Sequence, residues 1–290
     1  NRPNRHRTEA PWVYAAYGAL QGTDAIVHFA LDSADWSVKP GFFMQPWTLM
    51  SPTQIGQFPA AAWIYRNGLV REGEMVADLS LPLEDALALR GSPLVHAANL
   101  DELRKQDLPE NHADATASVG VDPLVHFVGH TNLRIGKGGN NSQVDCTRWI
   151  DRDKQQVTSS TGELMLDYGK GLLELRAPSA QGAVGAISAG GTIDLPDLRI
   201  ESPMELGAVV AVSLDGKPLK TSRRVLVQVM SEEKATGFAT ERLPDGRQRI
   251  VSIGGDPWLI RRLDGQLRLK RPDSASLRVI AMDLDGRKME

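Results

Sequence analysis

A short apolar run followed at once by polar and aromatic side chains is the first place in this sequence where a ligand could bind. Residues 25–31 read AIVHFAL, which is typical of a strand buried on both faces. His28 lies in that run, and Asp32, Asp35 and Trp36 follow it. Side chains at the carboxyl ends of strands line the active sites of α/β barrels. The spacing predicts a ligand-binding edge here, with an ordinary solvated strand end as the alternative.

The loop that follows is rich in aromatic residues. Phe42, Phe43 and Trp47 come after Trp36, with prolines among them. Exposed aromatic rings on such a loop would suit stacking against sugar rings. The alternative is that they pack over the rim of the fold.

Two histidines four residues apart, His126 and His130, have a spacing that binds zinc when it lies on a helix. The helical zinc motif has a Glu after the first histidine, however, and here Phe127 takes that place. Residues 124–130 look like a strand, on which both side chains would face one side. A zinc module that also uses Cys146 is a third reading of the chain. We expect a surface pair or a hydrogen-bonded pair, and we predict no metal site and no cofactor.

Carboxylate pairs for acid–base catalysis are not recognisable in the first part of the chain. Glycoside hydrolysis needs two carboxylates that face each other across the bond to be broken. Glu9 is the only Glu before residue 70, and it directly precedes an Ala-Pro helix start. We therefore interpret it as a charge at the helix N-terminus and assign no catalytic residue.

Composition excludes several classes of protein. The 290 residues carry 33 Lys and Arg against 36 Asp and Glu, so the net charge of −3 gives no footprint for nucleic acid. No run of 18 apolar residues occurs, which predicts no membrane span. With one cysteine, no internal disulfide can form.

The first part of the chain reads as alternating helix and strand. We expect a helix over 10–20 that ends at Gly22, and a second over 51–68 that Pro59 kinks or splits. Eleven of the 16 aromatic residues fall within 12–65, which marks a different architecture at the front.

From about residue 144 the pattern changes to short strands and turns. Four Asp-Gly pairs mark possible hairpins, because both turn residues of a tight hairpin take positive φ. Such strands and turns favour an antiparallel sandwich or a small barrel. The strand runs are 163–168, 171–176, 208–214, 224–229 and 277–282, and the Asp-Gly pairs begin at Asp215, Asp245, Asp264 and Asp285.

Several segments resemble the last quarter of bacterial (β/α)8-barrel glycoside hydrolases of the β-galactosidase, agarase and cellulase-like kind. The tail also resembles the β-sandwich that follows such barrels. The segments that carry the resemblance are NRHRTEAP at 4–11, AAYGALQGTDA at 15–25, QFPAAAWIYRNG at 57–68, the tail from TSSTGE at 158–163 through RAPSAQG at 176–182, and GDPWLI at 255–260.

The resemblance implies an α+β chain that contains the C-terminal remnant of a (β/α)8 barrel followed by an antiparallel β-sandwich. The last strand and helix units of the barrel would occupy residues 1–90, a connector with loops 91–143, and the sandwich 144–290. In this family both catalytic Glu residues would lie upstream of residue 1. The upstream barrel portion of the same protein is then a partner of this stretch.

The predicted function is that of the C-terminal portion of a retaining glycoside hydrolase that acts on an oligosaccharide or polysaccharide. A polysaccharide hydrolase would be secreted or periplasmic. The alternative is a non-catalytic β-sandwich module for carbohydrate binding or structural support. The residues expected to contact sugar are Arg5 at the rim, His28, Asp32, Trp36 and Trp47.

Overall fold

The computed structural model describes residues 4–28, 49, 51–88, 122–136, 141–283 and 286–289. Over these residues the chain is a strand-rich mixture of helices and largely antiparallel sheets, so the expected α+β class is confirmed at this level. The chain forms two compact units. The first contains residues 1–18, 24–70 and 170–290, and the second contains 19–23 and 71–169.

The helices of the first unit follow the sequence pattern closely. The predicted helix over 10–20 is confirmed, and Gly22 ends it with a φ of 63°. The predicted helix over 51–68 is split in two, with Pro59 in the first turn of the second piece. The helical elements are η1 (Arg5–Glu9), α1 (Ala10–Leu20, whose last two residues belong to the second unit), α2 (Pro52–Ile55), α3 (Phe58–Arg66), η4 (Ile187–Gly190) and η5 (Ser274–Ser276).

The strand predicted over 25–31 is not formed by residues 25–28. A strand needs a neighbour that shares its backbone hydrogen bonds, and within the described parts of the chain no strand pairs with 25–28. Residues 29–31 lie outside the described residues.

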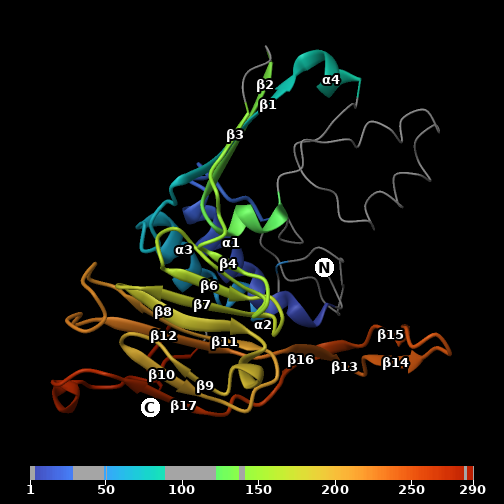
Figure 1. Cartoon of the computed structure of the whole chain (residues 1–290). Helices are drawn as coiled ribbons and strands as arrows, with labels where there is room; N and C mark the ends of the chain where they lie inside the picture. Colours follow the sequence, from blue (N-terminus) through green and yellow to red (C-terminus); the bar gives the residue numbers. More distant parts are fainter. Residues whose placement is uncertain are drawn as a thin grey trace, which may run out of the picture. The chain divides into compact units, whose positions relative to one another are not determined.

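Two antiparallel sheets build most of the first unit. Four strands lie in the order β12-β11-β8-β7, and three lie in the order β17-β10-β9 (Figure 1). The predicted strands at 171–176, 208–214 and 224–229 are confirmed within a residue or so. The strands are β7 (Leu172–Ala177), β8 (Ala180–Gly185), β9 (Thr192–Asp194), β10 (Leu198–Glu201), β11 (Gly207–Ser213), β12 (Val225–Met230) and β17 (Gln266–Leu269).

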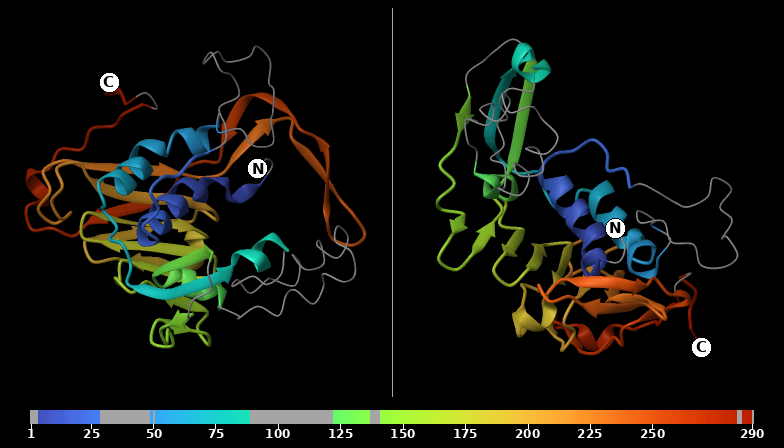
Figure 2. Two further views of the ribbon diagram at one scale, coloured as in Figure 1. Left: turned by 90° about the horizontal axis from the view of Figure 1, so that it is seen from above. Right: turned by 90° about the vertical axis from the view of Figure 1, so that its right-hand side faces the viewer.

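The two sheets share one hydrophobic core. Leu172, Ala183 and Val209 come from the four strands, and Ile193 and Ile200 come from the three. Every residue of β11 is buried, because the face of this strand that points away from the core is also covered. Figure 2 shows α1 and α3 side by side over that face.

Two ribbons extend the first unit. β13 (Glu233–Thr236) pairs with β16 (Gly255–Ile260), and β14 (Ala239–Arg242) pairs with β15 (Gln248–Ser252). The hairpin predicted at Asp245 is confirmed, since it joins β14 to β15.

Two further turn predictions and one strand prediction for this region need correction, and Asp285 of the fourth predicted turn lies outside the described residues. Asp215 lies in a longer link between β11 and β12, and Asp264 joins strands of different sheets. The predicted strand over 277–282 is wrong; its only β-bridge joins Met282 to Lys288. These side chains are exposed, so no apolar packing holds them in a ladder.

The second unit has its own hydrophobic core, formed by residues such as Val76, Val125 and Cys146. β1 and β2 pair in parallel, and the predicted strand at 163–168 is confirmed as β6. The strand predicted over 124–130 is wrong, because Asp122 and Pro123 start a 3-10 helix there. The elements are β1 (Met75–Pro82), α4 (Leu83–Leu87), η3 (Pro123–Phe127), β2 (His130–Gly136), β3 (Ser142–Gln143), β4 (Ile150–Asp151), β5 (Gln156–Thr158) and β6 (Leu164–Asp167).

Candidate functional site

Two of the five predicted sugar-contact residues, Arg5 and His28, lie in the described part of the chain. Asp32, Trp36 and Trp47 lie outside the described residues, so their predicted roles stay predictions. Arg5 pairs with carboxylates, whereas His28 packs against aromatic rings. The two residues therefore take part in separate groups of contacts.

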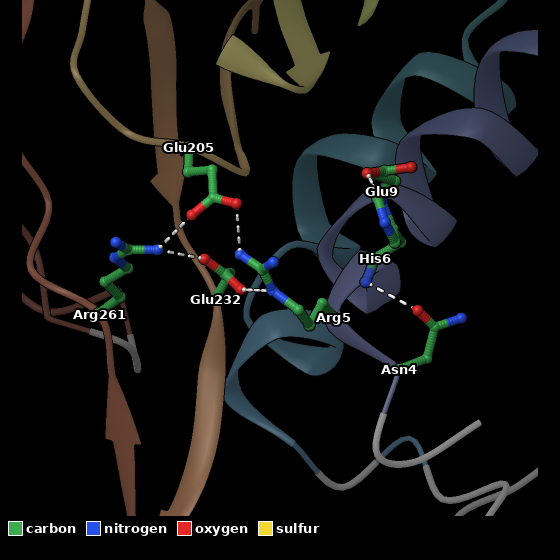
Figure 3. Close-up of polar contacts among 7 residues, drawn as sticks. All are labelled: Asn4, Arg5, His6, Glu9, Glu205, Glu232 and Arg261. Carbon is green, nitrogen blue, oxygen red and sulfur yellow. Dashed lines mark hydrogen bonds and ion pairs between the residues drawn. The ribbon is translucent and has the colours of Figure 1, made fainter. Parts of the chain in front are cut away.

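Arg5 is held at the start of η1 by local hydrogen bonds. The Asn4 side chain accepts from the backbone N–H of His6 at 2.9 Å and so caps this short helix. The imidazole of His6 lies 2.7 Å from the Glu9 carboxylate. These contacts fix the first turn, from which the Arg5 side chain extends towards the sheets (Figure 3).

Four side chains then form a closed ring of ion pairs, which we call the ion ring: Arg5, Glu205, Glu232 and Arg261. Nε and Nη2 of Arg5 lie 2.6 Å from Glu232 and 2.9 Å from Glu205. Nη1 of Arg261 lies 2.7 Å from Glu232 and 3.1 Å from Glu205. Each carboxylate thus accepts from both arginines, and four separate segments of the chain meet (Figure 3).

The charges of the ion ring decide what chemistry it can do. Hydrogen bonds from Arg5 and Arg261 lower the pKa of Glu205. Burial by itself would raise the pKa of Glu232, but hydrogen bonds from the same two arginines outweigh it and lower the pKa. A general acid at neutral pH needs a raised pKa. The ion ring is therefore suited to holding segments together and not to proton transfer.

A second ion pair lies beside the ion ring but is buried, and we call it the buried pair. Nη1 of Arg7 donates to Glu233 at 2.9 Å, and both side chains are only 4% and 5% exposed. Nη2 of Arg7 donates to the Gln54 side chain at 2.9 Å. The other oxygen of Glu233 accepts from the backbone N–H of Thr53 at 3.0 Å. The buried pair thus joins η1 and the start of α2 to β13.

Helix α3 and the break before it make further polar contacts to strands β11 and β12. Nε1 of Trp63 donates to the carbonyl of Ser213 at 2.8 Å. The Gln228 side chain accepts from the N–H of Ala60 at 3.1 Å and donates to the carbonyl of Gly56 at 2.8 Å. The N–H of Ala60 and the carbonyl of Gly56 lie at the break between α2 and α3, which leaves both groups without partners inside a helix. One side chain of β12 therefore satisfies both.

A hydrogen-bonded group of side chains holds the helices to one another. The buried indole N–H of Trp12 donates to Gln57, and Gln57 donates in turn to the carbonyl and hydroxyl oxygens of Thr8. Gln57 also donates to the carbonyl of Thr53, and since it is 1% exposed, its buried amide finds its partners within the helices.

His28 is half-buried and lies between two aromatic rings. Its ring centroid is 5.1 Å from that of Tyr14 and 4.8 Å from that of Phe58, both in edge-on geometry. Burial lowers the pKa of His28, so its imidazole is neutral at neutral pH. In this structure His28 connects α1 to the first residue of α3.

The two histidines at 126 and 130 have separate partners within the second unit. Nδ1 of His126 lies 2.9 Å from the Thr131 hydroxyl, which itself donates to Gln21. Nδ1 of His130 lies 2.8 Å from the Glu72 carboxylate. Over the described residues, no three His, Cys, Asp or Glu side chains are placed to hold a metal ion.

The residues that the sequence did not single out are the acidic partners. Glu232 and Glu233 come three and four residues after the end of the strand predicted over 224–229, and Arg5 and Arg7 alternate near the start of the chain. This charge pattern was a usable signal, but about 225 residues separate the two groups, and only the fold brings them together.

No protein-family model, curated protein or solved structure matches the chain. Among the described residues, no helix is long and apolar enough to cross a membrane.

Proposed function

We propose that the chain is the C-terminal portion of a bacterial retaining glycoside hydrolase, with the catalytic Glu pair on the barrel portion upstream of residue 1. In this proposal η1, α1, α2 and α3 are helices of the barrel remnant. The two antiparallel sheets are the β-sandwich that supports them, and an oligosaccharide or polysaccharide is the substrate.

The observation that supports this role most is the way the helices are fixed to the sheets within one compact unit. The buried pair, Gln228 and Trp63 connect three helical elements to strands that lie about 150 to 230 residues further along the chain. Buried polar contacts of this kind specify orientation, because a shifted helix would leave each group without its partner. A support that must keep part of a catalytic domain in place requires this property.

The proposal assigns sugar contacts to His28, Asp32, Trp36 and Trp47, with Arg5 at the rim. The ion pairs of Arg5 argue for a positioning role for this residue, because two carboxylates already occupy its guanidinium. Any sugar contact of Arg5 would have to compete with Glu205 and Glu232. His28 is neutral and could offer a hydrogen bond to a sugar hydroxyl.

Hydrolysis assays on residues 1–290 test the catalytic part of the proposal. We expect no turnover of a panel of aryl β-glycosides and β-linked oligosaccharides by this stretch. Restoring the upstream coding sequence should give turnover that a substitution of an upstream Glu abolishes. Robust hydrolysis by residues 1–290 would show that the chain carries its own carboxylate pair and would overturn this assignment.

The second candidate function is a non-catalytic carbohydrate-binding module. It is favoured by the core between the two sheets, which draws all its members from the strands and links of residues 172–269. Glycan-array binding by the whole chain distinguishes the two candidates when Trp36 and Trp47 are both changed to Ala. Binding that survives the double substitution supports the module, whereas binding that is lost supports sugar contacts on the aromatic loop.

A further inference from the structure

We propose that the ion ring is an acid-releasable latch, which holds the start of η1 against the base of the β13–β16 ribbon while the buried pair stays closed. This inference goes beyond the proposed function and does not depend on it.

The position of the ion ring makes it a junction. Glu232 directly precedes β13 and Arg261 directly follows β16, and the Arg261 N–H donates to the Glu232 carbonyl at 2.8 Å. These two residues therefore close the base of the ribbon. Glu205, in the link between β10 and β11, and Arg5 complete the ring from the other side. Opening the ring would free the start of η1 and the ribbon base together.

The ion ring and the buried pair differ in solvent exposure, so the ring can open while the buried pair stays closed. Side chains of Arg5, Glu205 and Arg261 are 53–54% exposed, whereas Glu232 is 12% exposed. Water and salt therefore reach three members of the ring and screen their attraction. Arg7 and Glu233 are about 5% exposed, so the same conditions act on them far less.

Protonation of one carboxylate is enough to unbalance the ring. The charged groups that face one another are the two arginines and the two glutamates, and the ring is neutral when both glutamates are ionised. With one glutamate protonated, two guanidinium groups share a single carboxylate, and their mutual repulsion is no longer offset. Nearby His6 and Glu9 are paired with each other and lie outside the ring.

The sign of the pH dependence follows from the lowered pKa values of Glu205 and Glu232. A carboxylate whose pKa is lower in the folded state stabilises that state above the ordinary pKa of Glu, about 4.3. This contribution is lost as the pH falls through the lowered value. The latch is therefore closed at neutral pH and opens in acid.

Hydrogen exchange resolved to single residues tests the latch on the whole chain. We compare protection factors at pH 7 and at steps from pH 4 down to pH 2 for the amides of His6 and Arg261, which report the ring, and for those of Val209 and Ala211, which report the core. Acid is expected to lower protection about tenfold at His6 and Arg261 and to leave the core amides unchanged. Loss of protection at all four amides together, or at none, would overturn the proposal.

A pair of variants removes the pH change from the experiment. Glu205→Gln should lower the protection of His6 and Arg261 at pH 7 to near the acid value of the unmodified protein. Glu241→Gln removes an equally exposed ion pair with Arg249 on the β14–β15 ribbon and serves as the matched control. Unchanged protection in Glu205→Gln, or an equal loss in both variants, contradicts a latch at the ion ring.

Discussion

Replacing Arg7 with Met tests whether the buried pair fixes the helices to the sheets. The substitution keeps an unbranched apolar chain in place of the aliphatic stem of Arg7 but removes the guanidinium. It leaves the Glu233 carboxylate, which is 5% exposed, with the N–H of Thr53 as the donor that remains from the contacts described above. It also leaves the Gln54 amide oxygen without the bond from Nη2.

The expected loss of stability follows from these two consequences. Breaking a buried ion pair by removing one partner destabilises a protein by about 3–5 kcal/mol, because a charge is left buried and uncompensated. Exposed pairs contribute only about 0.2–1 kcal/mol. Arg7→Met should therefore lower the free energy of unfolding by about 3–5 kcal/mol. Arg249→Met, which breaks the exposed pair with Glu241, should change it by less than about 1 kcal/mol.

Urea unfolding followed by tryptophan fluorescence measures both variants, since Trp12 is buried beside this site. The double variant Arg7→Met/Glu233→Leu removes both charges, and it should recover most of the stability lost in Arg7→Met. A loss for Arg7→Met no larger than that for Arg249→Met would refute the reasoning. So would a double variant that is less stable than Arg7→Met.

Three further predictions concern the rest of the first unit. Ile200→Ala removes a fully buried side chain from the core between the sheets and should cost about 2–5 kcal/mol in urea unfolding, well above the cost of the exposed substitution Ile253→Ala. Gln228→Leu leaves the N–H of Ala60 and the carbonyl of Gly56 unsatisfied, so it should lower the free energy of unfolding by about 1–3 kcal/mol per group. The control Gln248→Leu lies on an exposed strand and should have little effect. The pKa of Asp215 is held well below its usual range by the Arg223 N–H and the hydroxyls of Ser222 and Ser213, so its stabilisation is complete above about pH 4 and is lost in acid. A plot of unfolding free energy against pH should therefore fall less steeply below pH 4 in Asp215→Asn than in the unmodified protein, and parallel curves would contradict this assignment.

Short sequence signals, such as the position of a glycine or proline and an unbroken apolar run, correctly predicted several helices and strands of the first unit. Helix α1 follows from its small and aromatic residues with Gly22 at the end, and the division between α2 and α3 follows from Pro59. The strands β7, β11 and β12 are apolar runs that the pattern located within a residue or so. The Asp245 hairpin joins neighbouring strands through a short loop, which is the case that an Asp-Gly signal describes.

The predictions that failed, and the pairings that the sequence did not predict, have both local and non-local causes. Residues 124–130 have a strand-like composition, but capping by Asp122 and the proline after it favour a 3-10 turn. The parallel pairing of β1 with β2 joins segments about 50 residues apart, and nothing local signals it. Residues 25–28 have apolar side chains and no strand beside them among the described residues.

At the candidate site, the sequence likewise does not show which distant charged side chains form ion pairs. The resemblance predicts Arg5 at the rim of a sugar site, which stays a prediction, whereas the other three members of the ion ring come from three segments that only the fold brings together. The role expected for Arg5, a sugar contact at the rim, was drawn from a resemblance. The role supported by distances of 2.6 and 2.9 Å to two carboxylates is that of positioning η1.

The layer of helices also explains why polar contacts carry so much of the specificity in this unit. The helix faces that are buried combine small side chains, Ala15 and Ala16 on α1 and Ala60 and Ala61 on α3, with large ones such as Trp12 and Ile64. Small side chains allow close approach, but they bury little apolar area and present few ridges that would fix one orientation. A helix that shifted would lose part of the packing of its large side chains, and it would also break the hydrogen bonds of Gln228 and the buried pair. Weakening these polar contacts should therefore change the orientation of the helices before it unfolds the sheets, which the proposed role as a support for a catalytic domain would have to prevent.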